Sequence, residues 1–180
     1  SAPTNDETVT IIGGAGNNYY EVSGAEIVSI TNTDGNNNYE IDNFSGQQGY
    51  RLPAVNLVTI TTGNGNNTFE LDDVATAVLT AGNGANRFEI SSDNSADYTA
   101  PGDSVDFESD ITIKAGNGKN EINVEANWGI GVVNVTVGNG GNSIDASGHE
   151  VKITSGTGPD VIKVLADVIK INSGGGGDTI

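Results

Sequence analysis

The 180-residue sequence contains no cysteine, no methionine and one histidine, and only 7 Lys and Arg balance 24 Asp and Glu. Without cysteine, neither disulfide bonds nor thiolate metal sites can form. One histidine and no cysteine give poor support to a nucleophilic triad, and we expect no enzymatic activity. The formal net charge of −17 argues against nucleic acid or an anionic membrane as a partner and favours a cation or a basic partner.

Long apolar runs are also missing, and none approaches the roughly 18 residues that a transmembrane helix requires. The sequence therefore predicts no transmembrane segment. Because methionine is absent, we expect the sequence to be a processed or excised piece of a longer protein.

Glycine is abundant, with 26 residues, and it recurs with asparagine in a motif whose fullest form is Gly63-Asn64-Gly65-Asn66-Asn67-Thr68-Phe69-Glu70-Leu71. Eight copies can be aligned on their second glycine: Gly16, Gly35, Gly65, Gly84, Gly118, Gly140, Gly158 and Gly176. The successive spacings are 19, 30, 19, 34, 22, 18 and 18 residues. The basic period is therefore 18 to 19 residues, with three longer excursions.

Apolar residues form four columns when the copies are aligned, at seven and five residues before the glycine and at four and six residues after it. The column four residues after the glycine reads Tyr20, Tyr39, Phe69, Phe88, Ile122, Ile144, Ile162 and Ile180. The two members of each pair are two residues apart and point to the same side of a strand. Each copy thus predicts two short strands with inward apolar pairs. Such coils bury their apolar faces only by stacking, so the stack must fold as a unit.

The motif resembles the nonapeptide repeat G-G-x-G-x-D-x-U-x of the RTX (repeats-in-toxin) family, a calcium-binding parallel β-roll. The resemblance implies an all-β fold, a right-handed parallel β-roll or β-helix solenoid of about eight coils. We expect residues 1–180 to be a single solenoid segment with insertions near 43–56, 91–110 and 125–132. We also expect the native array to continue beyond Ile180. An antiparallel β-sandwich is the structural alternative.

In RTX proteins, Ca²⁺ lies between the motif turns of neighbouring coils. Carried over to matching positions, the resemblance implies a Ca²⁺ site formed by Gly156, Gly158, Asp160, Gly174, Gly176 and Asp178. Carbonyl and carboxylate oxygens are the ligands that Ca²⁺ prefers.

The first six copies carry asparagine where the RTX motif has aspartate. These residues are Asn18, Asn37, Asn67, Asn86, Asn120 and Asn142. An amide oxygen brings no charge to a metal site, so weaker Ca²⁺ ligation is one interpretation, with Asn117, Asn120, Asn139 and Asn142 as candidates. The alternative, which we favour, is a structural ladder of stacked, mutually hydrogen-bonded asparagines.

Other polar and aromatic residues give weaker indications of a binding site. Outward glutamates, Glu21, Glu40, Glu70 and Glu89, suit a solvated face that opposes aggregation, or a stripe that binds cations or a basic partner. The acids of the second insertion could form another Ca²⁺ site but lack a recognisable spacing. His149 is expected at the surface, and Trp128 and Tyr50 could either stack on sugar rings or anchor loops.

The resemblance implies a calcium-binding structural segment of a secreted bacterial cell-surface protein, of the surface-layer or adhesin type, exported by type I secretion. Extracellular Ca²⁺ would stabilise its fold. Possible partners are neighbouring copies of itself in a lattice or a cell-surface glycan. The alternative is a calcium-dependent β-roll module attached to a polysaccharide-modifying enzyme, similar to those of alginate epimerases, or to another type I-secreted enzyme or toxin.

Overall fold

The computed structural model describes residues 7–42, 55–92, 109–126 and 130–180. These residues form strands joined by turns, with no helix among them, and so contain no helix that could cross a lipid bilayer. The strands are β1 Thr8–Ile12, β2 Tyr19–Ser23, β3 Ile27–Thr31, β4 Asn38–Asp42, β5 Val55–Thr61, β6 Thr68–Asp72, β7 Val74–Ala81, β8 Arg87–Ser91, β9 Asp110–Ala115, β10 Glu121–Glu125, β11 Val132–Val137, β12 Ser143–Thr154 and β13 Val161–Asn172.

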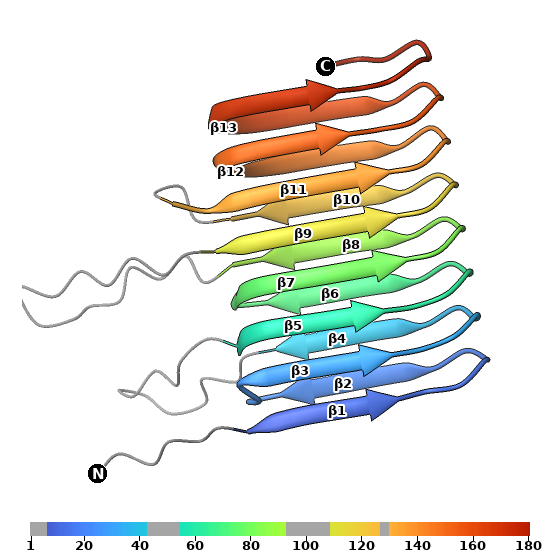
Figure 1. Cartoon of the computed structure of the whole chain (residues 1–180), viewed down its shortest axis with the longest axis vertical. Coiled ribbons are helices and arrows are strands. Elements are labelled where there is room, and N and C mark those ends of the chain that lie inside the picture. The colour runs from blue at the N-terminus through green and yellow to red at the C-terminus, as the bar shows by residue number, and fades with distance from the viewer. Residues whose placement is uncertain (1–6, 43–54, 93–108, 127–129) are drawn as a thin grey trace, which may run out of the picture.

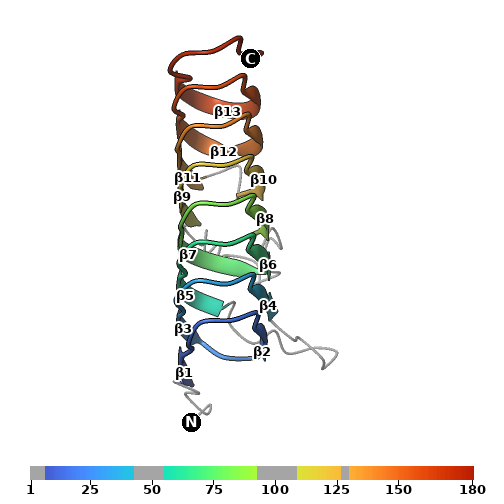
Figure 2. The ribbon, with the colours of Figure 1, turned by 90° about the vertical axis from the view of Figure 1, so that its right-hand side faces the viewer.

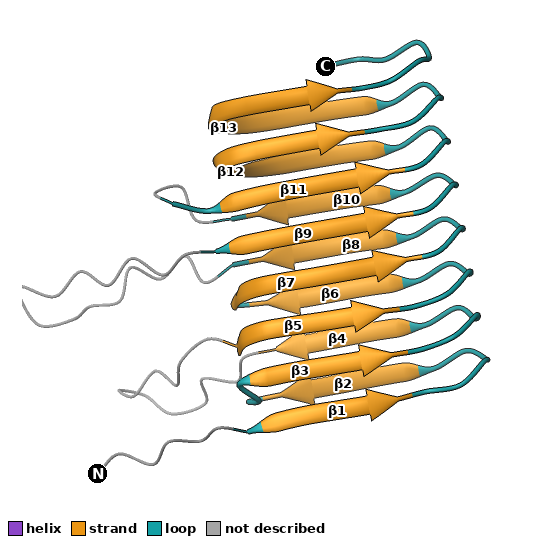
Figure 3. Cartoon of the chain, in the orientation of Figure 1, coloured by secondary structure: helices purple, strands orange, loops and turns teal. Residues whose placement is uncertain are grey.

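The strands belong to one strongly curled parallel sheet. Odd-numbered strands β1, β3, β5, β7, β9 and β11 pair in sequence along one side, and even-numbered strands β2, β4, β6, β8 and β10 pair along the other. Strand β12 joins both sides, because its first half pairs with β10 and its second half with β11. The result is a stack of flattened coils, consistent with a β-solenoid-like fold (Figure 1, Figure 3).

Each coil has two different edges. The motif glycines lie in the turns along one edge, which Figure 2 shows from the front as a regular stack. The opposite edge is a corner where the chain passes to the next coil, and in the two copies with the 18-residue spacing β12 and β13 run through it as continuous 12-residue strands. The expected pair of short strands is confirmed up to β11, whereas in β12 and β13 the two are joined across the corner into one strand; one glycine turn serves each coil.

The strand register places like residues on like, as the columns predicted. Tyr39 lies between Tyr20 and Phe69 in the register, and Ile41 lies between Val22 and Leu71. The buried core follows these columns through both halves of the stack. In the last coil, however, Ile169 and Ile180 are 48% and 71% exposed, because no described residues pack beyond them.

Aromatic rings fill the core on the even-numbered side in the first four coils. The centroids of Tyr20 and Tyr39 are 5.5 Å apart, those of Tyr39 and Phe69 5.0 Å, and those of Phe69 and Phe88 4.5 Å, all in stacked geometry. From Ile122 onward the same column contains isoleucine. The core is therefore filled differently in its two halves, as the sequence indicated.

The boundaries predicted for the insertions were too wide. Residues 55–56 belong to β5, Ser91 ends β8, Asp110 begins β9, Glu125 ends β10 and Val132 begins β11. Strand pairing holds the ends of these segments, so the regular sheet continues closer to each insertion than the apolar columns suggested. Residues 43–54, 93–108 and 127–129, with Tyr50, Trp128 and most of the loop acids, lie outside the described residues.

Tyr39 should make the fold sensitive to alkaline pH. Its ring is fully buried, its hydroxyl accepts a hydrogen bond from Asn32 Nδ2 at 2.9 Å, and burial raises its pKa above the ordinary value of 10.0. The stability that this neutral phenol contributes is present below about pH 10 and is lost as the pH rises through the raised pKa. We expect urea unfolding to show a steeper loss of stability above pH 10 in the wild type than in Tyr39→Phe. Equal slopes for the two proteins would contradict this assignment.

Candidate metal site at the glycine turns

The glycine turns stack so closely that side chains are excluded. The second motif glycines adopt positive φ, for example +141° at Gly65 and +144° at Gly84. A Cβ atom added at Gly84 would overlap the carbonyl oxygen of Gly65 in the neighbouring coil. The Gly65 N–H donates to the carbonyl of Asn83 at 2.8 Å. Glycine is therefore required here both by backbone conformation and by the approach of the next turn.

A buried asparagine ladder runs along the inner side of these turns and confirms the predicted stacking. Side-chain Nδ2 of each asparagine donates to Oδ1 of the residue in the next coil, at 2.8 Å for Asn18 to Asn37 and at 3.0 Å for the four following steps. The members of this inner ladder are Asn18, Asn37, Asn67, Asn86, Asn120 and Asn142, followed by Asp160.

The buried amides of the inner ladder, from Asn37 to Asn142, are well satisfied. Asn86, for example, is 1% exposed, and its Oδ1 accepts bonds from both the backbone N–H and Nδ2 of Asn67. Its Nδ2 donates to Asn120 and also to the carbonyls of Gly82 and Gly84. Buried polar groups that are fully hydrogen-bonded hold neighbouring coils in one register.

A second, exposed ladder lies on the outer side of the turns, one residue before the second motif glycine. Here the backbone N–H of each coil donates to the side chain of the preceding coil, at 2.7 to 2.9 Å. This outer ladder comprises Asp34, Asn64, Asn83, Asn117, Asn139 and Thr157. It was missed from the sequence, although asparagine recurs at this position in four consecutive copies.

The four asparagines considered as weaker Ca²⁺ ligands are divided between the ladders. Asn120 and Asn142 are buried in the inner ladder, and Asn117 and Asn139 belong to the outer ladder. Asn120 Oδ1 accepts the N–H and Nδ2 of Asn86, and Asn142 Oδ1 accepts the same two groups of Asn120. Asn117 Oδ1 accepts the Asn139 N–H, and Asn139 Oδ1 accepts the N–H and the hydroxyl of Thr157. These amide oxygens therefore already act as acceptors within the protein.

At Asp160, which is 1% exposed, the inner ladder contains a carboxylate in place of an amide. Its Oδ1 accepts the N–H and Nδ2 of Asn142, at 2.8 and 2.9 Å, as an asparagine would. Its Oδ2 occupies the place of the missing amide nitrogen and has no hydrogen-bond partner among the described residues. An asparagine at this position would use its Nδ2 group to donate to Asp178 Oδ1 and to the Gly158 carbonyl, as Asn142 does to Asp160 and Gly140. Asp160 has no such group, so these two hydrogen bonds are missing from the ladder.

The residues implied by the RTX resemblance do come together around this gap. The backbone N–H of Asp160 donates to Asp178 Oδ1 at 3.0 Å, and the Gly158 N–H donates to Gly175 O at 2.7 Å. Gly174 and Gly176 stack directly on Gly156 and Gly158, where an added Cβ would overlap the carbonyl oxygens below.

This arrangement fits a hard cation in its donor chemistry. Two carboxylates and neighbouring turn carbonyls supply oxygen atoms only, and the partly exposed Asp178 leaves room for water ligands. Within the described ranges no group of three or more His, Asp or Glu side chains could hold a metal ion, so any ion at this place would need backbone oxygens as further ligands. A buried carboxylate oxygen without a partner is costly unless a cation or proton neutralises it.

The remaining candidates lie away from this gap. The outward glutamates lie opposite one another on neighbouring strands, Glu40 between Glu21 and Glu70, with Glu70 beside Glu89. His149 is partly exposed at the corner edge, where its Nδ1 lies 3.1 Å from Asp167 Oδ2.

Comparisons with known proteins add no relationship: no family model, no curated protein and no solved structure matches this chain.

Proposed function

We propose that this chain is a calcium-stabilised structural segment of a secreted bacterial cell-surface protein, built as a right-handed parallel β-roll that resembles RTX repeats. The observation that carries the proposal is the buried Oδ2 of Asp160, which has no hydrogen-bond partner among the described residues although the buried amides of the ladder before it are hydrogen-bonded. The resemblance of the motif to the RTX repeat supports calcium as the cation.

In this proposal, bound Ca²⁺ replaces the hydrogens that Asp160 lacks. Asp160 Oδ2, Asp178 and the turn carbonyls of Gly156, Gly158 and Gly174 would hold the ion between the last two glycine turns. The six asparagine coils need no ion, because their amides supply both donors and acceptors. Metal dependence would thus be confined to the C-terminal coils.

Ligand binding to the folded state stabilises it by mass action, by about 2.7 kcal/mol at a free concentration 100 times the Kd. A bacterial surface protein meets abundant calcium only outside the cell. The C-terminal coils would therefore become stable after export, and the asparagine ladder would hold the remaining coils in either environment.

The substitution Asp160→Asn tests this function because it restores the missing amide. We expect the apo form of Asp160→Asn to be more stable than the apo wild type by about 1–3 kcal/mol, since the new Nδ2 can donate to Asp178 and Gly158. Calcium should raise the melting temperature of the wild type, whereas the Asp160→Asn variant should respond weakly or not at all. Thermal melts in EDTA and in Ca²⁺, with isothermal titration calorimetry, measure both effects.

Asp145→Asn is the matched control, because it makes the same charge change on an exposed carboxylate of β12. This control should keep the calcium response of the wild type. A wild type that binds no Ca²⁺ would overturn the proposal. So would an unchanged calcium response in Asp160→Asn.

A further inference from the structure

The two sides of the coil stack differ sharply in charge. The outward face of the even-numbered side, including the first half of β12, carries Glu21, Glu40, Asp42, Glu70, Asp72, Glu89, Glu121, Glu125 and Asp145. On the odd-numbered side, strands β9, β11, β12 and β13 carry outward lysine, threonine and asparagine, and their outward acids, Asp110 and Glu150, lie level with Val132 at the corner ends of the strands. A chain with a net charge of −17 thus keeps one face over its C-terminal coils largely free of acids.

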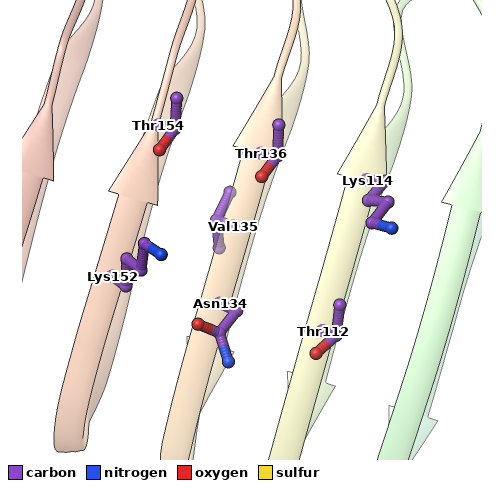
Figure 4. A pocket seen from close by; sticks show the side chains of 7 residues that line it. All are labelled: Thr112, Lys114, Asn134, Val135, Thr136, Lys152 and Thr154. Atoms are coloured by element: carbon purple, nitrogen blue, oxygen red, sulfur yellow. The ribbon is translucent and has the colours of Figure 1, made fainter.

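A depression of about 240 Å³ lies on this second face, across β9, β11 and β12 (Figure 4). Its polar lining consists of Thr112, Lys114, Asn134, Thr136, Lys152 and Thr154, which we call the lysine groove. A second depression of about 370 Å³ shares Lys152 and Thr154 with it and adds Lys170 and Asn172 from β13. The two depressions therefore form one path that crosses four neighbouring strands.

The lysine groove has unused positive charge. Among the described residues, Lys114 and Lys152 form no ion pair, whereas Lys170 Nζ lies 2.6 Å from Glu150 Oε1. The hydrogen bond from Lys170 is the main cause that lowers the pKa of Glu150, and the charge of Lys152 contributes least. No acidic residue lines either depression.

Strand spacing sets the distance between the free lysines. Strand β11 lies between β9 and β12, and neighbouring strands are about 4.8 Å apart; because Lys114 is level with Thr136 and Lys152 with Asn134, two residues apart along the strands, their backbones are roughly 12 Å apart. Asn134 and Thr136 stand on β11 between them, and the Lys152 ammonium points toward this strand in Figure 4. Two flexible cations thus flank a row of neutral hydrogen-bonding groups.

We propose that the lysine groove binds a polysaccharide whose sugars carry carboxylate groups. Lys114 and Lys152 would pair with carboxylates, and the threonine hydroxyls and the Asn134 amide would bond to sugar hydroxyls. The long, shallow path suits an extended polymer with repeating polar groups, and the acidic opposite face would repel the same polymer. No aromatic side chain lines the groove, so it offers no stacking platform for nucleic-acid bases.

The test compares two double variants with the same loss of charge. Lys114→Gln/Lys152→Gln removes the free cations of the groove, and Arg87→Gln/Lys163→Gln removes two cations from the acidic face, where they pair with Glu89 and Asp145. Binding of short oligogalacturonates is measured by isothermal titration calorimetry in calcium-containing buffer of low ionic strength. We expect the groove variant to bind about tenfold more weakly, as two exposed ion pairs would allow, and the face variant to bind within twofold of the wild type.

Each other outcome overturns the proposal. Absence of oligogalacturonate binding by the wild type would exclude the ligand class, and an equal loss in both variants would show unspecific attraction. Full binding by the groove variant in calcium would mean that the metal bridges the sugar to acidic residues elsewhere. Equally tight binding of single-stranded DNA would show a general polyanion site. These results are separate from the metal proposal, because calcium binding is followed in the same proteins by the response of their melting temperature.

Discussion

Replacing Gly84 by alanine is expected to destabilise the chain by roughly 3–5 kcal/mol. Gly84 has a φ of +144°, which side-chain-bearing residues avoid, and its added Cβ would overlap the backbone of Gly65. Strained backbone and overpacking each cost on the order of 1–3 kcal/mol, and here they act on the same atom. Equilibrium unfolding in urea, followed by circular dichroism, measures the loss.

Gly14→Ala provides the control for this prediction. No atom lies within 4 Å of a Cβ built at Gly14, and its φ is not positive. The substitution should change the unfolding free energy by less than about 1 kcal/mol. Equal destabilisation by Gly14→Ala and Gly84→Ala would show that the close stacking of turns is not what requires glycine.

The second large effect is expected from Asn86→Leu, in the middle of the inner ladder. The change removes the acceptor of the Asn67 N–H and Nδ2 and the donor to Asn120 Oδ1. Because these groups are buried and each unsatisfied one costs about 1–3 kcal/mol, we expect a loss of roughly 3 kcal/mol or more. Hydrogen exchange should show reduced protection in the turns on both sides of Asn86.

Asn83→Leu tests the same residue type in the outer ladder. Asn83 Oδ1 accepts the Asn117 N–H at 2.8 Å, but the bond is exposed and water can replace it. A loss of less than about 1 kcal/mol is expected. If Asn83→Leu were as damaging as Asn86→Leu, burial would not be the reason for the strength of the inner ladder.

Much of this architecture could be predicted because each coil repeats the same local chemistry. The four apolar columns determine which side chains face inward, and Phe69, Phe88 and Ile122 stack in the register that their alignment predicts. The inner ladder was also predictable, since Asn67 and Asn86 stand at the same position of their motifs and follow a glycine by two residues. Residues at one position of a parallel stack become neighbours.

Features that combine different positions of the repeat could not be predicted in the same way. The lysine groove joins Lys114, which lies four residues before its motif glycine, to Lys152, which lies six residues before its own. No column contains both residues, and they meet only because β11 lies between their strands. Similarly, the gap at Asp160 appears only when the donors of Asn142 are followed into the next coil.

The separation of each coil into a glycine-turn edge and a corner edge determines where the chain can change length. All three of the longer repeat spacings fall between an even-numbered strand and the next odd-numbered one, at the corner, while the register of the flanking strands is kept. Extra length costs little entropy, about 0.6 kcal/mol for each doubling of a flexible loop. The corner edge is therefore suited to the insertion of foreign peptides, and peptides inserted in successive coils would be displayed at intervals set by the strand spacing.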